Sequence, residues 1–436
     1  MTAPGRMVDG QAMDRKSVGA WCFYDWANSP FPAIVLTFVI PAYFTQAVMA
    51  DPATATTWWA IMTGTAALAI AVLSPILGAI ADQGRRRKPW LAVFTIIMAL
   101  ASALLWFVRP EADQAILLLV LVGVGVVAFE LSMVFYNALL PSLVPRHWLG
   151  RISGWAWGLG YFGGVGGLLL VLFGFVMANP PPFGLDDSEG ALEHVRISGP
   201  IIGLWLLLFC IPLFVWTRDP RGRGLAAGAA IRSGLSELRT TLARLHRHPQ
   251  LWRYLLARMI FTDGLNTLFA FGGVFAAGTF GMAVAEVIMF GLILNVTAGA
   301  GAFVFGWIDD RIGAKRTILL GLCGLVVVGV PLLLVESKLA FVILGATLGI
   351  FFGPVQAASR SLMARITPEG MEGEMFGLYA LSGKATAFVG PWLVALITAL
   401  TGSQRWGMAS VLPFLVVGGV LLWLTVRDVP PGRQSR

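Results

Sequence analysis

Long apolar stretches separated by short polar breaks run along the whole chain. They cover residues 18–48, 56–81, 89–108, 115–140, 153–178, 200–216, 254–279, 283–308, 317–335, 338–363, 374–400 and 407–426. A helix needs roughly 17 to 25 apolar residues to cross the hydrocarbon core of a bilayer. The pattern therefore predicts an all-α integral membrane protein with twelve transmembrane helices. Because twelve is an even number, both termini are expected on one side.

The composition excludes a soluble protein. Hydrophobic residues make up 57% of the chain and charged residues only 12%, whereas about 25% of the residues in ordinary globular domains are charged. The mean hydropathy is +0.78. Too few charges remain to cover the surface of a water-soluble particle of this size.

Basic residues lie mostly on the side of the termini. Of 31 Lys and Arg residues, 26 are assigned to that side, in the polar breaks or at the adjoining ends of the apolar stretches, with Arg360 and Arg365 counted among them. Lys384 is the one basic residue assigned to the interior of a stretch. Cytoplasmic loops carry an excess of Lys and Arg. We therefore expect a multi-pass protein of the plasma (inner) membrane with cytoplasmic termini. The same distribution explains the net charge of +8 without nucleic acid as a partner.

The chain divides into two halves around a polar segment. We expect a six-helix bundle at residues 1–216, a linker at 217–253 and a second six-helix bundle at 254–436. Within the linker, apolar residues recur at helical spacing, at Ile231, Leu235, Leu238, Leu242 and Leu245. This spacing favours an amphipathic helix at the membrane surface. A solvated linker is the alternative.

Three segments of the first half return in the second half at similar offsets. Gly78 and Asp82 with the following basic run correspond to Gly306 and Asp310, at an offset of 228. Pro145, Gly150, Gly154 and Gly160 correspond to Pro368, Gly373, Gly377 and Gly383, at an offset of 223. Asp25 and Asn28 correspond to Asp263 and Asn266, at an offset of 238. Repeats in the same order predict two bundles related by an axis along the membrane normal.

These segments resemble those of a known transporter superfamily. The stretches 78–88 and 306–316 resemble the loop signature of the major facilitator superfamily, whose fold has twelve helices in two halves. More narrowly, the segments 24–29 (Tyr-Asp-Trp-Ala-Asn-Ser), 136–141 (Tyr-Asn-Ala-Leu-Leu-Pro), 263–264 (Asp-Gly) and 359–362 (Ser-Arg-Ser-Leu) resemble those of its vacuole-effluxer family. The resemblance implies a secondary transporter. It also implies efflux, since vacuolar members are associated with the export of amino acids.

The repeated loop predicts a conformational latch. We expect Gly78 to allow close helix approach and Asp82 to pair with Arg85 or Arg86, with the second copy at Gly306, Asp310 and Arg311. The alternative is that these basic residues only fix the topology.

Ionisable residues inside the bilayer are the candidates for substrate and proton binding. Five are assigned to the interior of apolar stretches, away from the charged helix ends: Asp25, Glu130, Asp263, Glu286 and Lys384. Each is costly to insert, so it is expected to face a cavity or a partner. Glu286 is close enough to a helix end to be exposed to water. Uncharged candidates for the cavity wall are Asn28, Asn137, Asn266 and Gln356, with ordinary interhelical bonding as their alternative.

The two repeated acids suggest one binding cavity. Asp25 and Asp263 are expected to face it from opposite halves and to bind an ammonium group or a proton, or else to pair with a rim residue such as Arg258. Pro30 and Pro32 should interrupt the first helix, and Gly264 should loosen the seventh. Lys384 could bind a substrate carboxylate or pair with Glu130.

No catalytic, metal-binding or nucleotide-binding pattern accompanies these residues. Cys22, Cys210 and Cys323 lie far apart without metal-site spacing, and no Gly-x-x-x-x-Gly-Lys-Ser/Thr loop occurs. We therefore expect a monomeric secondary transporter, not an enzyme and without a cofactor or a metal. It would move a small polar solute by alternating access, driven by a solute or proton gradient. A non-transporting sensor or scaffold and a lipid-translocating protein are the alternatives.

Overall fold

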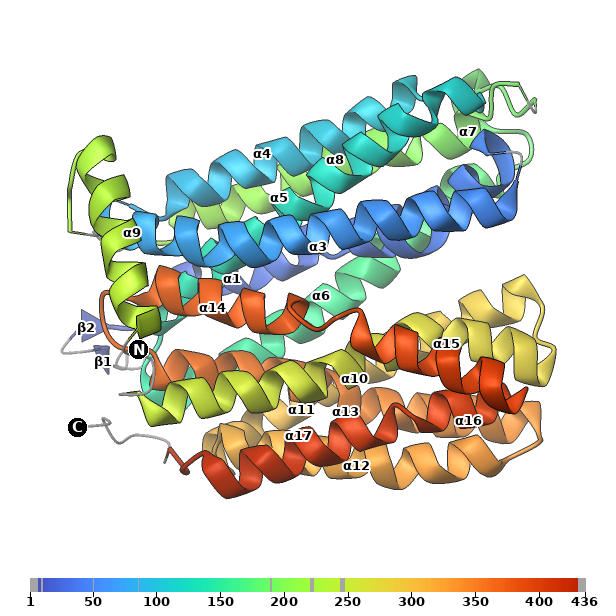
Figure 1. Cartoon of the computed structure of the whole chain (residues 1–436). Coiled ribbons are helices and arrows are strands. Elements are labelled where there is room, and N and C mark those ends of the chain that lie inside the picture. The colour runs from blue at the N-terminus through green and yellow to red at the C-terminus, as the bar shows by residue number, and fades with distance from the viewer. Residues whose placement is uncertain are drawn as a thin grey trace, which may run out of the picture.

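The structure is a computed structural model that describes residues 7–8, 11–49, 51–84, 86–188, 190–219, 223–243 and 248–429. The described residues contain 12 helical segments long and apolar enough to cross a membrane. These segments form two pseudo-symmetric six-helix bundles, with the N-terminal bundle above the C-terminal one in Figure 1. The predicted fold class is therefore confirmed.

The N-terminal bundle follows a two-stranded hairpin, β1 (Met7–Val8) and β2 (Gln11–Ala12). Its helices are α1 (Arg15–Asn28), α2 (Val39–Tyr43), α3 (Pro52–Gln83), α4 (Lys88–Leu104), α5 (Ala115–Leu143), α6 (Leu149–Val171), α7 (Glu193–Arg196) and α8 (Ser198–Trp216). Single-turn and π-helical segments extend several of them, at Pro32–Phe38, Phe44–Val48, Leu105–Phe107, Ala112–Gln114, Arg146–Trp148, Leu172–Val176 and Pro182–Gly184.

The C-terminal bundle follows a separate linker helix, α9 (Ala227–Ala243). Its helices are α10 (Pro249–Phe280), α11 (Val284–Ile312), α12 (Ala314–Leu334), α13 (Lys338–Ile366), α14 (Glu372–Lys384), α15 (Val389–Thr401), α16 (Gln404–Ala409) and α17 (Leu412–Thr425). The division of the chain at residues 216 and 254 stays a prediction; α10 itself begins at Pro249.

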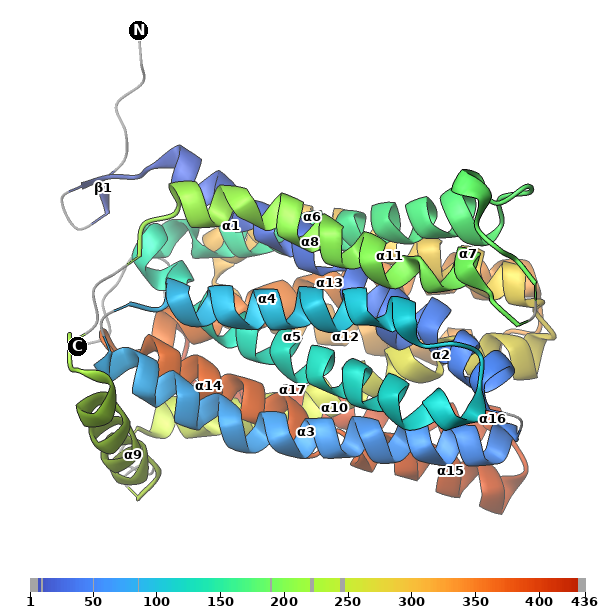
Figure 2. The ribbon, with the colours of Figure 1, turned by 90° about the horizontal axis from the view of Figure 1, so that it is seen from above.

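Both ends of the described chain and α9 lie at one end of the bundle, and α7 lies at the other (Figures 1 and 2). We call the first end the terminus side and the second the far side. The arrangement agrees with an even number of crossings.

Two spans are interrupted inside the bundle. α1 ends at Asn28, and a π-helical segment begins at Pro32, because proline lacks an amide hydrogen and clashes with the preceding turn. The eleventh span breaks between Lys384, the end of α14, and Val389, the start of α15. In contrast, α10 runs without a break through Gly264, so the expected loosening of the seventh helix was wrong.

Glycines bring the two bundles into close contact. α3 packs on α14, and α6 packs on α11. A Cβ atom on Gly78 would overlap the carbonyl of Gly373 in α14. Gly154 lies on α6 opposite Gly306, where an added Cβ would lie 2.9 Å from the Gly306 Cα. Side chains at these positions would therefore force the halves apart.

The linker helix α9 packs across the terminus-side end of α3. Ala230 and Leu238 are buried, and a Cβ on Gly234 would lie 2.8 Å from the Ile80 Cα. An apolar stripe beside this contact, formed by Ile231, Leu235 and Leu242, is exposed. The position of this stripe at a membrane surface stays a prediction, and Leu245 lies outside the described residues.

We predict that Gly78→Ala lowers the melting temperature of the purified protein. Overpacking costs about 1–3 kcal/mol, and the added methyl group would meet backbone atoms that cannot turn away. Gly64→Ala, on the same helix with open space around it, is the matched control. It should be neutral or stabilising by about 0.5–1 kcal/mol, because alanine favours helices. Equal melting temperatures for the two variants would contradict the tight contact of α3 with α14.

Candidate functional site

Asp82 joins the two bundles on the terminus side. Its carboxylate accepts hydrogen bonds from the backbone amides of Gly373 (2.9 Å) and Glu374 (2.8 Å) in the first turn of α14. Arg87 donates to Asp82 at 2.7 Å and to Glu372 at 2.6 Å. We call these five residues the first latch. Burial lowers the pKa of Arg87, but the nearby Asp82 and Glu372 outweigh it and raise that pKa above its usual value.

Asp310 makes the equivalent contact in the opposite direction. It accepts the amides of Gly150 (2.9 Å) and Arg151 (3.3 Å) in the first turn of α6 and pairs with the Arg151 side chain at 2.6 Å. Arg365 forms an ion pair with the neighbouring Asp309 at 2.8 Å and donates a hydrogen bond to Asp310 at 3.4 Å. These residues form the second latch.

The two latches share one physical principle. In each, a carboxylate from one bundle accepts the free amides at the N-terminus of a helix in the other bundle. Such amides carry partial positive charge, and hydrogen bonds to an ion are stronger than neutral ones. The contacts join α3 to α14 and α11 to α6, so the halves are held together on the terminus side.

The basic partners in the latches differ from the predicted ones. Asp82 pairs with Arg87, whereas Arg86 is exposed and Arg85 lies outside the described residues. Arg311 is also exposed, and Asp310 pairs with Arg151 instead. The reason is geometric: the chain turns after Gln83, and Arg87, at the N-cap of α4, points back into the bundle.

Arg360 forms the next connection toward the middle of the bundle. It lies on α13 with 1% of its surface exposed and donates to the Asp25 carboxylate at 2.9 Å and the Asn137 side chain at 3.3 Å. It also donates to the Ser153 hydroxyl and carbonyl at 2.9 and 2.8 Å. We call Arg360, Asp25, Asn137 and Ser153 the arginine cluster. It ties α13 to three helices of the N-terminal bundle.

Aromatic rings enclose the guanidinium of Arg360. Its central carbon lies 5.0 Å from the Trp21 ring centroid and 5.6 Å from those of Tyr136 and Trp157. Trp21 and Tyr136 stack on each other with centroids 4.4 Å apart. Ring faces attract cations. The charge is therefore compensated on several sides, and Asp25 is paired rather than open to a cavity.

Sequence reasoning missed Arg360 as a site residue. It assigned this residue to the terminus-side end of the tenth span and named Lys384 as the one basic residue inside a span, which was wrong because Arg360 lies within α13 and is buried. A signal was available: the offset of 223 that relates the two halves maps Asn137 onto Arg360. Arg87, Glu372, Arg151, Arg365 and Asp309 were also missed.

Glu130 and Lys384 form the innermost ion pair between the halves. The Lys384 ammonium lies 2.6 Å from the Glu130 carboxylate, with side-chain exposures of 28% and 22%. In the Arg360–Asp25 pair these exposures are only 1% and 6%. Lys384 ends α14, immediately before the break in the eleventh span. The side chains of this pair are therefore partly accessible to solvent, unlike those of the Arg360–Asp25 pair.

The repeated acids Asp25 and Asp263 have different surroundings. Asp263 accepts the amide of Gly390 at 3.3 Å in the first turn of α15 and makes no ion pair among the described residues. Arg258 donates instead to the Tyr379 carbonyl and the Ser382 hydroxyl. Both acids are buried in this structure, with 4% and 2% of their surfaces exposed, so the expectation that they face one cavity stays a prediction.

The other candidates lie apart from these charges. Asn28 is buried, and its amide approaches the Met133 sulfur at 3.4 Å. Asn266 and Gln356 are half-buried. Glu286 pairs with Lys338 at 3.1 Å, and both side chains are about half exposed, at 46% and 48%.

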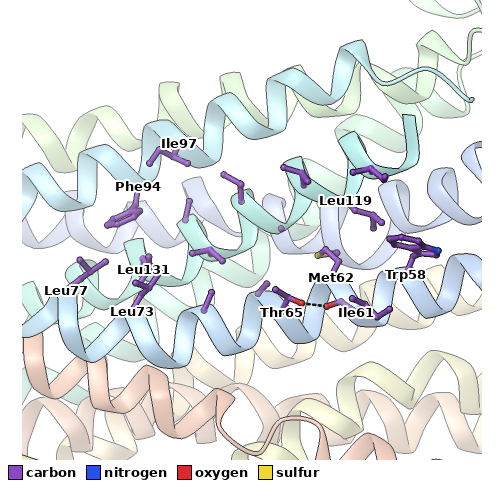
Figure 3. A pocket seen from close by; sticks show the side chains of 18 residues that line it. Trp58, Ile61, Met62, Thr65, Leu73, Leu77, Phe94, Ile97, Leu119 and Leu131 are labelled. Atoms are coloured by element: carbon purple, nitrogen blue, oxygen red, sulfur yellow. Dashed lines mark hydrogen bonds between the residues drawn. The ribbon is translucent and has the colours of Figure 1, made fainter. Parts of the chain in front are cut away.

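A cavity of about 570 Å³ lies between α3, α4 and α5 (Figure 3). Apolar side chains such as Met62, Phe94 and Leu131 line it. The Thr65 hydroxyl in its wall already donates to the Ile61 carbonyl at 2.8 Å. The cavity has no charged side chain in its lining, so it is separate from the polar connections between the halves.

Comparison with known proteins identifies the family. The family model described as "Vacuole effluxer Atg22 like" matches residues 53–434. The chain belongs to this family. The latches and ion pairs described above are therefore features of a member of the vacuole-effluxer family.

Relatives and solved structures agree with this assignment. An uncharacterized MFS-type transporter of Bacillus subtilis (strain 168), YxiO, is 27% identical over 410 residues, covering 93% of this chain and 94% of that protein. Autophagy-related protein 22 of Cryptococcus neoformans var. neoformans serotype D (strain JEC21) is 25% identical over 304 residues, covering 64% of this chain and 52% of that protein.

The fold is similar to that of the proton:xylose symporter XylE, with a TM-score of 0.73, 11% identity and 96% of each chain covered. This member of the vacuole-effluxer family is a multi-pass transporter of the major facilitator type and not an enzyme.

We predict that Asp82→Asn speeds hydrogen exchange at the amides of Gly373 and Glu374. Loss of the charge weakens their hydrogen bonds to residue 82, and bonds to charged groups contribute about 1.5–3 kcal/mol, so exchange should rise at least about tenfold. Asp310→Asn is the matched control and should speed exchange at Gly150 and Arg151 instead. Hydrogen–deuterium exchange with mass spectrometry measures both. Equal effects at both helix starts would contradict two separate latches.

We predict that Arg360→Met destabilises the protein by about 3–5 kcal/mol, because it leaves the Asp25 charge buried without a partner. Adding Asp25→Asn should recover much of this loss. Thermal unfolding of the single and double variants in detergent gives the comparison. If the two substitutions add without recovery, the ion pair is not the main interaction of either residue.

Proposed function

We propose that this transporter moves a small zwitterionic solute, such as an amino acid or a related metabolite, by alternating access. The observation that carries the proposal is the Glu130–Lys384 pair, which joins the two halves and is partly exposed on both side chains. The solute carboxylate would bind Lys384 and its ammonium would bind Glu130. The two protein charges would then be separated by the solute rather than paired directly.

Charge balance favours a zwitterion over a solute with a net charge. The Glu130–Lys384 pair is neutral as a unit, and it stays neutral when a zwitterion is inserted between its members. A solute with a net charge would leave one charge uncompensated in a poorly hydrated site, which is costly. The amino-acid export associated with vacuolar members of the family supports the same class of solute.

The connections between the halves support a rocking mechanism. The latches and the arginine cluster join the halves on the terminus side of the Glu130–Lys384 pair. Opening that side requires the latch carboxylates to leave the amides of α6 and α14. Separation of Glu130 from Lys384 by the solute would link binding to this movement, as alternating access requires.

We place the protein in the plasma membrane with both termini in the cytoplasm. The excess of Lys and Arg on the terminus side supports this orientation. Lipid translocation is less well supported, because the apolar cavity of Figure 3 has no charged residue that could hold a headgroup.

We predict that zwitterionic amino acids raise the melting temperature of the purified protein. A ligand at about 100 times its dissociation constant stabilises by about 2.7 kcal/mol. N-acetyl amino acids, which lack the ammonium group, and amino-acid methyl esters, which lack the carboxylate, should give no shift. Glu130→Gln and Lys384→Gln should each abolish the shift for the zwitterions.

Glu286→Gln is the matched control, because Glu286 also pairs with a lysine but does so on the exposed far side. It should retain the full shift. A shift that survives in both Glu130→Gln and Lys384→Gln would refute the proposed site. A shift produced equally by the blocked derivatives would refute recognition of a zwitterion.

A further inference from the structure

Asp263 lies where the eleventh span is broken. α14 ends at Lys384 and α15 starts at Val389. The Gly390 amide, in the first turn of α15, donates to the Asp263 carboxylate at 3.3 Å. A Cβ on Gly390 would lie 3.0 Å from the same carboxylate oxygen. The glycine therefore lets the start of α15 approach Asp263 closely.

The second carboxylate oxygen of Asp263 has no partner. Only 2% of the Asp263 surface is exposed, and its Oδ2 atom is buried without a hydrogen bond to any residue that the structure describes. Asp25, the repeat counterpart, has its charge compensated by Arg360 at 2.9 Å. The two related acids therefore differ in whether a positively charged side chain lies beside them.

Every charged group on the elements around Asp263 has a different partner or lies at a helix end. On α10 itself Arg258 binds Tyr379 and Ser382, and Arg253 lies near the helix start against the Trp252 ring. On α14 Lys384 binds Glu130 and Glu372 binds Arg87, while Glu374 lies in the first turn. On α13 Arg360 binds Asp25, Arg365 pairs with Asp309, and Lys338 binds Glu286 of α11. On α11 Asp310 binds Arg151 and Arg311 is exposed, and on α16 Arg405 binds the Leu333 carbonyl. α15 and α17 contain no charged residue.

A buried carboxylate without a counter-charge favours uptake of a proton. An ion is costly to hold in a poorly hydrated interior, and the acid avoids this cost when it is neutral. The N-terminus of α15 acts in the opposite direction, because its amides stabilise the anion. Both charge states are therefore accessible at Asp263, whereas Asp25 has the Arg360 guanidinium as its counter-charge.

We propose that Asp263 is the proton-binding carboxyl group that couples this transporter to a proton gradient. Its Oδ2 atom takes up a proton from water on the far side while the terminus side is closed. It returns the proton to water on the terminus side after the halves have rocked. The identity of the coupling ion rests on the proposed transport function, but proton binding by Asp263 does not.

The broken span links Asp263 to the proposed solute site. Residues 385–388 connect Lys384, which pairs with Glu130, to the start of α15, which contacts Asp263. Deprotonation creates a full negative charge that attracts the α15 amides more strongly. The resulting shift in α15 is transmitted through these four residues to Lys384. Proton binding and solute binding therefore both act on the connection between α14 and α15.

Infrared difference spectroscopy of the purified protein tests proton binding without any solute. Spectra of wild type in acidic minus alkaline buffer should contain a carbonyl-stretching band of a protonated carboxylic acid. Asp263→Asn should remove a component of this band. Asp25→Asn is the matched control and should leave this component of the band in place, because Asp25, unlike Asp263, has a counter-charge in Arg360. Asp263→Glu, which retains a carboxyl group, should move the component to a new frequency.

Three results would overturn the proposal. The first is that wild type lacks the band, and the second is that neither substitution at residue 263 changes it. The third is that the band disappears when potassium is replaced by sodium at constant pH. The last result would assign the site to sodium. Protein that shows the Asp263 band but no thermal shift with amino acids would refute only the proposed function. The reverse result would refute only this inference.

Discussion

The hydrogen bonds from helix-end amides to a carboxylate of the opposite half govern how the two bundles fit together. Asp82 accepts the first amides of α14, and Asp310 accepts those of α6. Such a contact brings the backbone close to the opposite helix: a Cβ on Gly373 would lie 2.8 Å from the Asp82 carboxylate, and one on Gly150 would lie 2.6 Å from the side chain of Asp309, the neighbour of Asp310. It uses groups that every helix start leaves unpaired. The halves therefore meet through strong but few interactions, which suits an interface that must open and close.

The charges deeper in the bundle form a series from fully paired to unpaired. Arg360 has hydrogen-bond acceptors and aromatic rings around it, and its pair with Asp25 is almost fully buried. Glu130 and Lys384 are paired but accessible. Asp263 has an amide on one oxygen and, within the described part of the chain, no partner on the other. A pair that is fully enclosed stabilises one conformation, whereas an accessible or incomplete one can exchange its partner for a ligand.

Hydropathy predicted the fold because each span must be apolar by itself, so the signal for α4 or α12 lies within one short stretch of the chain. The repeat located Asp82 and Asp310 for a similar reason, since their helix-start partners recur at a constant offset. Partners remained unpredictable where they depend on side-chain direction. Arg85, Arg86 and Arg87 are equivalent by sequence, but the turn before α4 points Arg87 inward. Arg360 was missed because a basic residue near a helix end is more often a topology signal.

The long separation in sequence between Asp25 and Arg360 has a consequence for biosynthesis. The two residues are 335 positions apart, so the first span enters the bilayer long before the ribosome has made the tenth. Until then Asp25 has no Arg360 to pair with, and Glu130 likewise has no partner before Lys384 has been made. An isolated charge at the centre of a span costs roughly 2.5–3.5 kcal/mol on insertion scales. The N-terminal bundle is thus an incomplete assembly intermediate, whose interior is finished only when the last helices of the chain arrive.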